Sequence, residues 1–207
     1  MERIDTHISA LFLVDDRVYK LKRAVRLPFL DFTDIATRRA ACEAELAVNR
    51  RTAPDLYLGV RPVTPDGRVG GAGDAVDWVV EMRRFDGDSL FNKLAEAGRL
   101  DGDLLEETAV EIARFHAAAA RRSDLWRPED VRSLIDGIAD SFPADPPSPV
   151  FGDAVAAAVG RIRDLAGRGA ELMDARRAEG FVRDVHGDLH LRNIVLWRGK
   201  PTLFDAI

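Results

Sequence analysis

The hydrophobic pattern of this chain changes character near residue 85, and that change limits the folds open to it. Before this point, short apolar segments rich in β-branched residues are separated by turn signals such as Asp15-Asp16. The exception is a segment that Thr33 or Asp34 can cap as a helix and that ends before Pro54. The strands are predicted over residues 8–14, 18–22, 56–63 and 76–83, and the helix over residues 34–50.

Beyond residue 85, apolar residues such as Leu104, Thr108, Ile112 and Phe115 fall at helical spacing. Further helices are predicted over residues 128–140 and 150–178, with Gly167-Arg168-Gly169 as a candidate break. Prolines at 143, 146, 147 and 149 mark a loop, and short strands are predicted over residues 181–185, 193–197 and 202–204. The expected fold class is therefore α+β, with a β-rich lobe over residues 1–84, a mainly helical lobe over residues 85–207 and a cleft between them.

Composition limits the partners and the cellular compartment to be expected for this chain. The 30 basic and 35 acidic residues give a net charge of −5, which argues against a nucleic-acid partner. No apolar run approaches the ~18–20 residues that span a bilayer, and no secretory signal opens the chain. The single cysteine, Cys42, cannot form an internal disulfide. We therefore expect a cytoplasmic protein with no membrane partner.

The densest polar cluster is the sequence HGDLHLRN, which begins at His186 and lies between two apolar segments. It contains Asp188 and Asn193, and Asp205 follows twelve residues beyond Asn193. Oxygen ligands that meet at one cleft suit Mg²⁺, which prefers one or two carboxylates together with water and phosphate oxygens. Asp188 can then orient and deprotonate an attacking hydroxyl. These residues predict metal-assisted phosphoryl transfer, with Asn193 and Asp205 as the metal ligands.

This spacing resembles the catalytic loop of protein kinases, and HGDLHLRN with LFDAI is similar to the aminoglycoside phosphotransferase and choline kinase branch. The resemblance implies a two-lobed protein-kinase-like fold and transfer of the γ-phosphate of Mg-ATP to a hydroxyl of a small molecule. It is closest to a bacterial group of such domains that is often fused to a P-loop kinase domain. Further segments that carry it are DTHIS at the start, VYKLKR, CEAELAVNRRTAPDLYLGV and WVVEMRRF.

The resemblance implies roles for residues of the first lobe. Lys20 would pair with the phosphates of ATP, with Lys22 as the alternative. Only four of the 30 basic residues are lysines, and these two lie together. Glu45 would hold the lysine, and Glu43 is the alternative; the two cannot both point inward from one helix.

Other residues would complete the nucleotide site. Backbone groups of Glu81 and Met82 would read adenine, and His190 would reach the γ-phosphate. The chain has no G-x-G-x-x-G loop, and the turn that ends at Ser9 stands in its place, where backbone N–H groups and the Ser9 hydroxyl could contact phosphate. His186 is expected to brace the loop rather than to react.

Two other functions remain open at this point. The chain could be a nucleotide-binding module without turnover that regulates a fused kinase domain. It could also be a metal-dependent phosphoesterase that uses His186, Asp188 and His190. The acceptor pocket of the family lies largely in helices of the second lobe, partly after the metal-binding aspartate. Because Asp205 is close to the last residue, Ile207, we expect the second lobe to be truncated.

Overall fold

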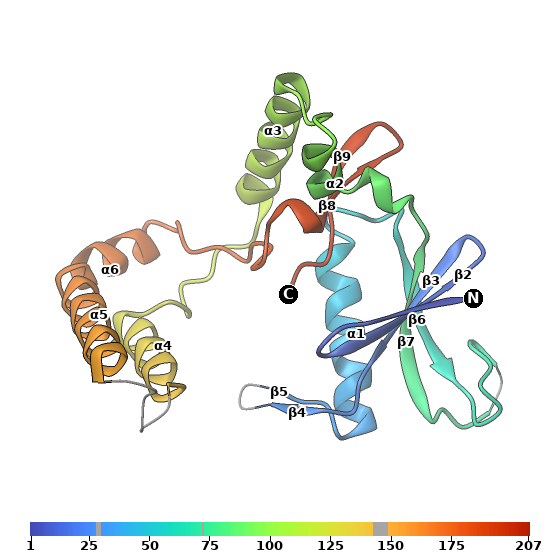
Figure 1. Cartoon of the computed structure of the whole chain (residues 1–207), viewed down its shortest axis with the longest axis horizontal. Helices are drawn as coiled ribbons and strands as arrows, with labels where there is room; N and C mark the ends of the chain where they lie inside the picture. The colour runs from blue at the N-terminus through green and yellow to red at the C-terminus, as the bar shows by residue number, and fades with distance from the viewer. Residues whose placement is uncertain (28–29, 72, 143–148) are drawn as a thin grey trace. The chain divides into compact units, whose positions relative to one another are not determined.

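A five-stranded antiparallel sheet organises the N-terminal half of the chain, with the strand order β1-β2-β3-β7-β6 (Figure 1). The computed structural model describes residues 1–27, 30–71, 73–142 and 149–207. Within these ranges the fold is α+β, and the chain forms six α-helices in addition to this sheet. The strands of the sheet are β1 (Glu2–Asp5), β2 (Ser9–Val14), β3 (Arg17–Lys22), β6 (Tyr57–Val63) and β7 (Asp77–Arg83).

The structure confirms the four strands predicted from apolar alternation, which are β2, β3, β6 and β7. Strand β1 was not predicted, because all four of its residues are exposed and show no apolar pattern. It pairs antiparallel with β2, so that Glu2 lies opposite Leu13. A two-residue turn at Asp15-Asp16 joins β2 to β3, as the sequence indicates. A short hairpin of β4 (Arg26–Leu27) and β5 (Leu30–Asp31) follows β3.

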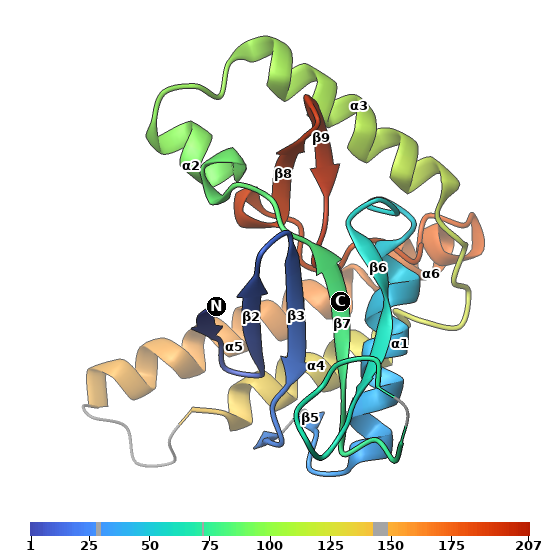
Figure 2. The ribbon, with the colours of Figure 1, turned by 90° about the vertical axis from the view of Figure 1, so that its right-hand side faces the viewer.

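Helix α1 (Ile35–Asn49) packs on the sheet, chiefly against β7 and then β6, as Figure 2 shows. Asp34 is its N-cap: the carboxylate accepts a hydrogen bond from the Thr37 backbone N–H at 2.9 Å. The helix ends at Asn49, five residues before Pro54. Cys42 on its inner face is fully buried. The main apolar core lies here, and it contains Val18, Cys42, Leu56, Tyr57, Val80, Met82 and Phe204 among others.

The chain forms two compact units. The first contains residues 1–117 and 186–207, so the sheet and α1 share it with the last segment of the chain. Residues 84 and 85, where we place the lobe boundary, both lie inside this unit, and the division into two lobes stays a prediction. The remaining elements of the first unit are η1 (Gly87–Ser89), α2 (Phe91–Glu96), most of α3 (Gly102–Ala118), η2 (Leu191–Asn193), β8 (Ile194–Trp197) and β9 (Lys200–Leu203).

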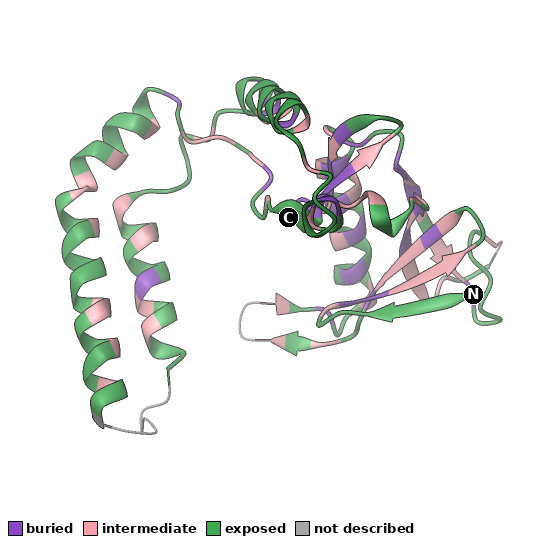
Figure 3. Ribbon diagram, turned by 45° about the horizontal axis from the view of Figure 1, so that its top comes forward, coloured by how far each residue is buried: buried purple, intermediate pink, exposed green. Residues whose placement is uncertain are grey.

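The second unit, residues 118–185, is built from three helices that contact one another. Figure 3 shows that most of their surface is exposed. Helix α5 ends at Arg168 and α6 begins at Ala170, which confirms the predicted break. The strand expected over residues 181–185 is wrong: only an isolated bridge joins Arg183 to Arg121. The helices are α4 (Pro128–Asp140), α5 (Pro149–Arg168) and α6 (Ala170–Ala178).

The loop predicted around Pro143, Pro146 and Pro147 lies outside the described residues, and Pro149, which was predicted in the same loop, is the first residue of α5. Among the helices of the described ranges, none combines the length and the apolar character needed to cross a membrane.

Candidate functional site

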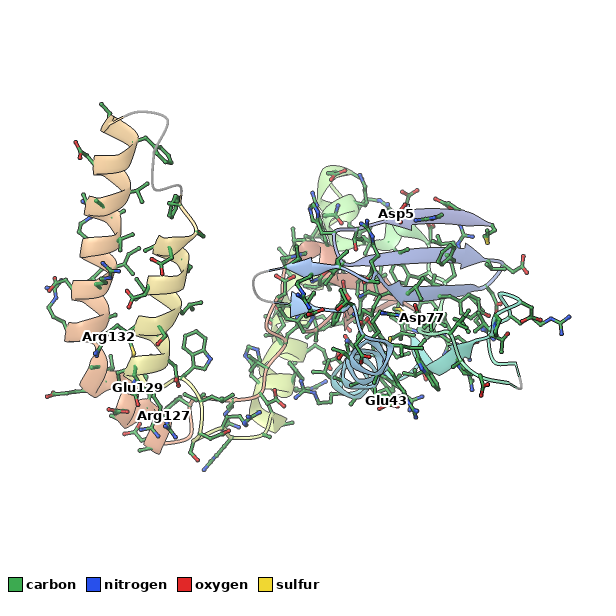
Figure 4. The ribbon with its side chains drawn as sticks, turned by 90° about the horizontal axis from the view of Figure 1, so that it is seen from below. Asp5, Glu43, Asp77, Arg127, Glu129 and Arg132 are labelled. Carbon is green, nitrogen blue, oxygen red and sulfur yellow. The ribbon has the colours of Figure 1, made fainter. Side chains whose placement is uncertain are left out.

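Two lysines of β3 converge on one glutamate of α1. Side chains two residues apart on a strand share a face, and the Lys20 Nζ atom lies 2.8 Å from the Glu45 Oε1 atom. Lys22 donates a hydrogen bond to the Oε2 atom of the same carboxylate. Glu43 is exposed on the outer side of α1, where it pairs with Arg39 at 2.9 Å (Figure 4). The helix therefore presents Glu45, and not Glu43, to both lysines.

Asp205 reaches the same cluster from the other end of the chain. It follows β9, and its Oδ1 atom lies 2.5 Å from the Lys20 Nζ atom. The side chain of Glu45 is 6% exposed and that of Asp205 is 41% exposed, so the cluster has one closed side and one open side. Burial alone would lower the pKa of Lys20, but the attraction of Glu45 and Asp205 outweighs it and raises the pKa. The Lys20 ammonium therefore stays charged.

His186 braces the loop that carries Asp188. The ring is almost fully buried, and its Nε2 atom lies 2.9 Å from the carbonyl oxygen of Phe204. Its Nδ1 atom accepts a hydrogen bond from the Asp188 backbone N–H at 3.4 Å. This pattern fits a neutral ring that is protonated on Nε2, and burial lowers the pKa of His186. The ring therefore connects the loop to the residue that precedes Asp205.

Asp188, Asn193 and His190 lie together in this loop. The Asn193 Nδ2 atom donates to the Asp188 carbonyl oxygen at 2.9 Å and lies 3.4 Å from the Asp188 Oδ2 atom. The His190 Nε2 atom lies 3.5 Å from the same Oδ2 atom, and the His190 Nδ1 atom accepts from the Arg192 backbone N–H. The Asp188 side chain is 53% exposed. Its carboxylate is therefore oriented by neighbours and still open to a ligand.

The other predicted nucleotide-site residues lie on β2 and β7, the two strands that flank β3. Glu81 and Met82 are inside β7, which pairs with β3 on one side and β6 on the other. Met82 belongs to the core, and the Glu81 carboxylate lies 2.8 Å from Arg61. In the register of β3 and β7, Met82 and Glu81 lie opposite Val18 and Tyr19, and their role as adenine readers stays a prediction. Ser9 lies opposite Lys22 in the sheet, and its buried hydroxyl has no partner among the described residues.

Asn193 and Asp205 carry the oxygen atoms predicted to hold Mg²⁺. The contacts of the Asn193 amide with Asp188 come from its Nδ2 atom, and Phe204, next to Asp205, donates its backbone N–H to the Asn193 carbonyl oxygen at 3.0 Å. A carboxylate and an amide oxygen are ligands that a hard cation accepts. Within the described ranges, three or more His, Cys, Asp or Glu side chains are nowhere grouped to hold a metal ion. The two donors fit an ion that water and phosphate oxygens would largely coordinate.

The structure also shows contacts that the sequence did not reveal. The Tyr57 hydroxyl and the Asn49 amide hold the backbone of Asp205 and Ala206. Tyr57 is one of several apolar or aromatic strand residues, and Asn49 is an ordinary last residue of a helix. The only available signal was the position of Asn49 four residues after Glu45, which places both on one helix face.

A cavity of about 660 Å³ lies apart from this cluster. Acidic side chains of α3 form one wall, and strand β9 forms another. The lining residues are Thr52, Asp103, Glu106, Glu107, Val110, Glu111, Arg114, Lys200, Pro201 and Thr202. The cavity therefore does not include the residues predicted to carry the chemistry.

Comparisons with known proteins give relatives without a described function. No protein-family model matches the chain, and no solved structure matches it. Curated proteins that match are an uncharacterized protein of Mycobacterium bovis and uncharacterized proteins of two strains of Mycobacterium tuberculosis. Each is 28% identical over 208 residues, which cover 98% of this chain and 40% of the relative. The chain thus spans about two-fifths of the length of these relatives.

Proposed function

We propose that this chain is an ATP-dependent phosphotransferase of the protein-kinase-like, two-lobed type. It would transfer the γ-phosphate of Mg-ATP to a hydroxyl of a small molecule, as in the aminoglycoside phosphotransferase family that the sequence resembles. One observation carries the proposal: the Lys20 ammonium lies 2.8 Å from Glu45 and 2.5 Å from Asp205. These residues come from β3, α1 and the segment after β9, and a lysine, its helix glutamate and a metal-binding aspartate are the parts that protein kinases use for phosphoryl transfer.

The proposed roles follow from charge and exposure. Lys20 would neutralise phosphate oxygens, because its ammonium is held in place by Glu45 and borders the open side of the cluster. Asp188 would orient the acceptor hydroxyl and accept its proton, since its carboxylate is exposed and is oriented by Asn193. His190 lies beside that carboxylate and would contact the transferred group. Catalysis would come mostly from position and electrostatics.

The metal ion has a limited place in this proposal. Asn193 and Asp205 would hold Mg²⁺, and their amide and carboxylate oxygens are suitable donors. When bound, the ion would offset the charge of the phosphate oxygens. Lys20 contacts Asp205 directly, so the Lys20 ammonium balances the negative charge of the Asp205 carboxylate in this structure.

The relatives suggest a larger protein. Because the chain spans about two-fifths of their length, a longer protein has room for a second domain. A fused P-loop kinase domain fits the bacterial group that the sequence resembles. In such a protein the acceptor of the phosphate, and further residues of the site, could come from outside this chain.

The proposal is tested with the purified chain and Mg-ATP. We expect nucleotide binding by calorimetry and, with a panel of hydroxyl compounds, phosphorylated products by mass spectrometry. Asp188→Asn should lower transfer by about 10²–10⁴-fold and leave Mg-ATP affinity within a few-fold, because the carboxylate acts on the acceptor. Asp153→Asn, an exposed position of α5, is the matched control and should change neither quantity.

Three outcomes would contradict the proposal. Mg-ATP binding without transfer to any acceptor, in this chain and in the full-length relatives, would favour a regulatory nucleotide-binding module. Hydrolysis of phosphate esters without nucleotide would favour a phosphoesterase. Transfer that Asp188→Asn leaves unchanged would remove the assigned base.

A further inference from the structure

Asp205 has an unusual backbone conformation. Its φ angle is +60°, in the left-handed region that residues other than glycine rarely adopt. Asp15, Trp126 and Arg198 share this region. Asp15 and Arg198 lie in two-residue hairpin turns, where it is common, and Trp126 lies in the segment just before α4. Asp205 follows strand β9 outside any hairpin. Such a conformation persists only where the surrounding structure determines it, and it is found preferentially at functional sites.

Tyr57 holds the backbone of Asp205 from strand β6. The residue is 1% exposed, and its hydroxyl oxygen accepts a hydrogen bond from the Asp205 backbone N–H at 3.1 Å. The ring is fixed in the core, so the hydroxyl cannot follow the aspartate if its backbone moves. The hydroxyl oxygen therefore occupies a fixed position from which it accepts the N–H of the left-handed conformation.

Asn49 holds the next residue from the end of α1. Its side chain is fully buried; the Oδ1 atom accepts the Ala206 backbone N–H at 2.8 Å, and the Nδ2 atom donates to the Ala206 carbonyl oxygen at 3.2 Å. The same Nδ2 atom donates to the Glu45 carbonyl oxygen at 2.9 Å. One amide thus connects the helix turn that carries Glu45 to the residue after Asp205.

We propose that Tyr57 and Asn49 are positioning residues that fix the carboxylate of Asp205 relative to Lys20 and Glu45 by locking the backbone of Asp205 and Ala206. Neither side chain touches a reactant. Without them the Asp205 backbone would relax to a common φ angle and turn its carboxylate away from Lys20. For catalysis this inference rests on the proposed function, because the fixed carboxylate matters there as a ligand of Mg²⁺. The locked backbone itself does not depend on that function.

The test compares the two tyrosines of the chain. Tyr57→Phe keeps the ring in the core and removes only the hydroxyl acceptor, and Tyr19→Phe on β3 is the matched control. Hydrogen exchange should be about tenfold faster at the Asp205 amide in Tyr57→Phe. The Mg²⁺ concentration for half-maximal nucleotide binding should rise about tenfold, while the nucleotide affinity without Mg²⁺ should stay within about twofold. A general loss of structure would weaken both the binding of Mg²⁺ and the binding of nucleotide without Mg²⁺. Tyr19→Phe should leave all three quantities unchanged.

The outcomes separate this inference from the proposed function. If the Asp205 amide exchanges equally fast in Tyr57→Phe and in the unaltered chain, the locked backbone is refuted, whatever the chain binds. If the unaltered chain binds no Mg-nucleotide, the proposed function fails, and the exchange rates still decide the backbone lock. Asn49→Ala should accelerate exchange at Ala206 in the same way. Where that variant does not fold, Tyr57→Phe decides alone.

Discussion

Lys22 and Glu45 form an ion pair that is buried on both sides, with side-chain exposures of 8% and 6%. The other oxygen of Glu45 is held by Lys20, so one carboxylate has two cationic partners. Only Lys20 also contacts Asp205. If the Lys20 side chain turned toward a phosphate, the Glu45 carboxylate would still be paired with the Lys22 ammonium. The two lysines therefore have different tasks, although they are two residues apart on one strand.

Replacing each lysine by methionine should separate these tasks. Lys20→Met should weaken Mg-ATP binding at least about tenfold, because its ammonium is the one that borders the open side of the cluster. Lys22→Met should mainly reduce the free energy of unfolding, by about 1–3 kcal/mol, since Glu45 keeps one partner and loses less than a fully broken buried pair. Calorimetry and urea unfolding measure the two quantities.

Lys93→Met is the control for both variants. Lys93 is exposed on α2, where it pairs with Glu96, and its replacement should change neither quantity. The division of tasks is refuted if Lys20→Met and Lys22→Met weaken nucleotide binding equally while the free energy of unfolding stays the same.

Much of this fold is predictable because single segments carry their own signals. Apolar alternation located β2, β3, β6 and β7, and Asp34 and Pro54 marked the limits of α1. The strand expected over residues 181–185 fails for a physical reason: its pairing with the segment around Arg121 is limited to a single bridge, and Phe181 is 68% exposed. Apolar character alone does not define a strand when the pairing does not extend along the segment and its apolar side chains stay exposed.

The candidate site was predictable to a different degree. Lys20, Glu45 and Asp205 were named from the sequence, and the structure brings them together. Tyr57 and Asn49 could not be named, because their role depends on Asp205 and Ala206, which lie about 150 residues further along the chain. A hydrogen bond between distant segments leaves no periodic pattern in either one.

Gly187 should tolerate alanine less well than another glycine with the same conformation. Its φ angle is +83°, and an added Cβ would lie 2.9 Å from the Ile207 Cγ1 atom. Gly199 has a φ angle of +78° and open space around it. Gly199→Ala should cost about 1–2 kcal/mol of unfolding free energy for backbone strain alone. Gly187→Ala should cost more, because the segment after Asp205 must also move; equal losses in urea unfolding would contradict this contact.

Cys42 should report on the opening of the core. It is fully buried, and burial raises the pKa of its thiol to about 11. Thiolates react and thiols do not, so at pH 8 an aromatic disulfide reagent should modify the folded chain at least about 100-fold more slowly than the chain in urea. Binding of Mg-ATP should slow the reaction further, since a ligand stabilises the folded state. Rapid modification of the folded chain would show that this core opens readily.

His186 should make the stability of the chain depend on pH. Burial lowers the pKa of His186 below its ordinary value of 6.5 in the folded chain, while the unfolded chain takes up a proton near 6.5. Stability from this residue is therefore complete above pH 6.5 and is lost as the pH falls toward the folded value, because the unfolded state then binds more protons.

His186→Gln should lower the free energy of unfolding by about 1–2 kcal/mol at pH 7.5, because at least one of the two backbone contacts weakens. It should also flatten the decline in stability between pH 7 and pH 5. His7→Gln, at an exposed position, should leave the decline as it is. Parallel pH profiles for His186→Gln and the unaltered chain in urea unfolding would show that the ring does not stay neutral in the folded state.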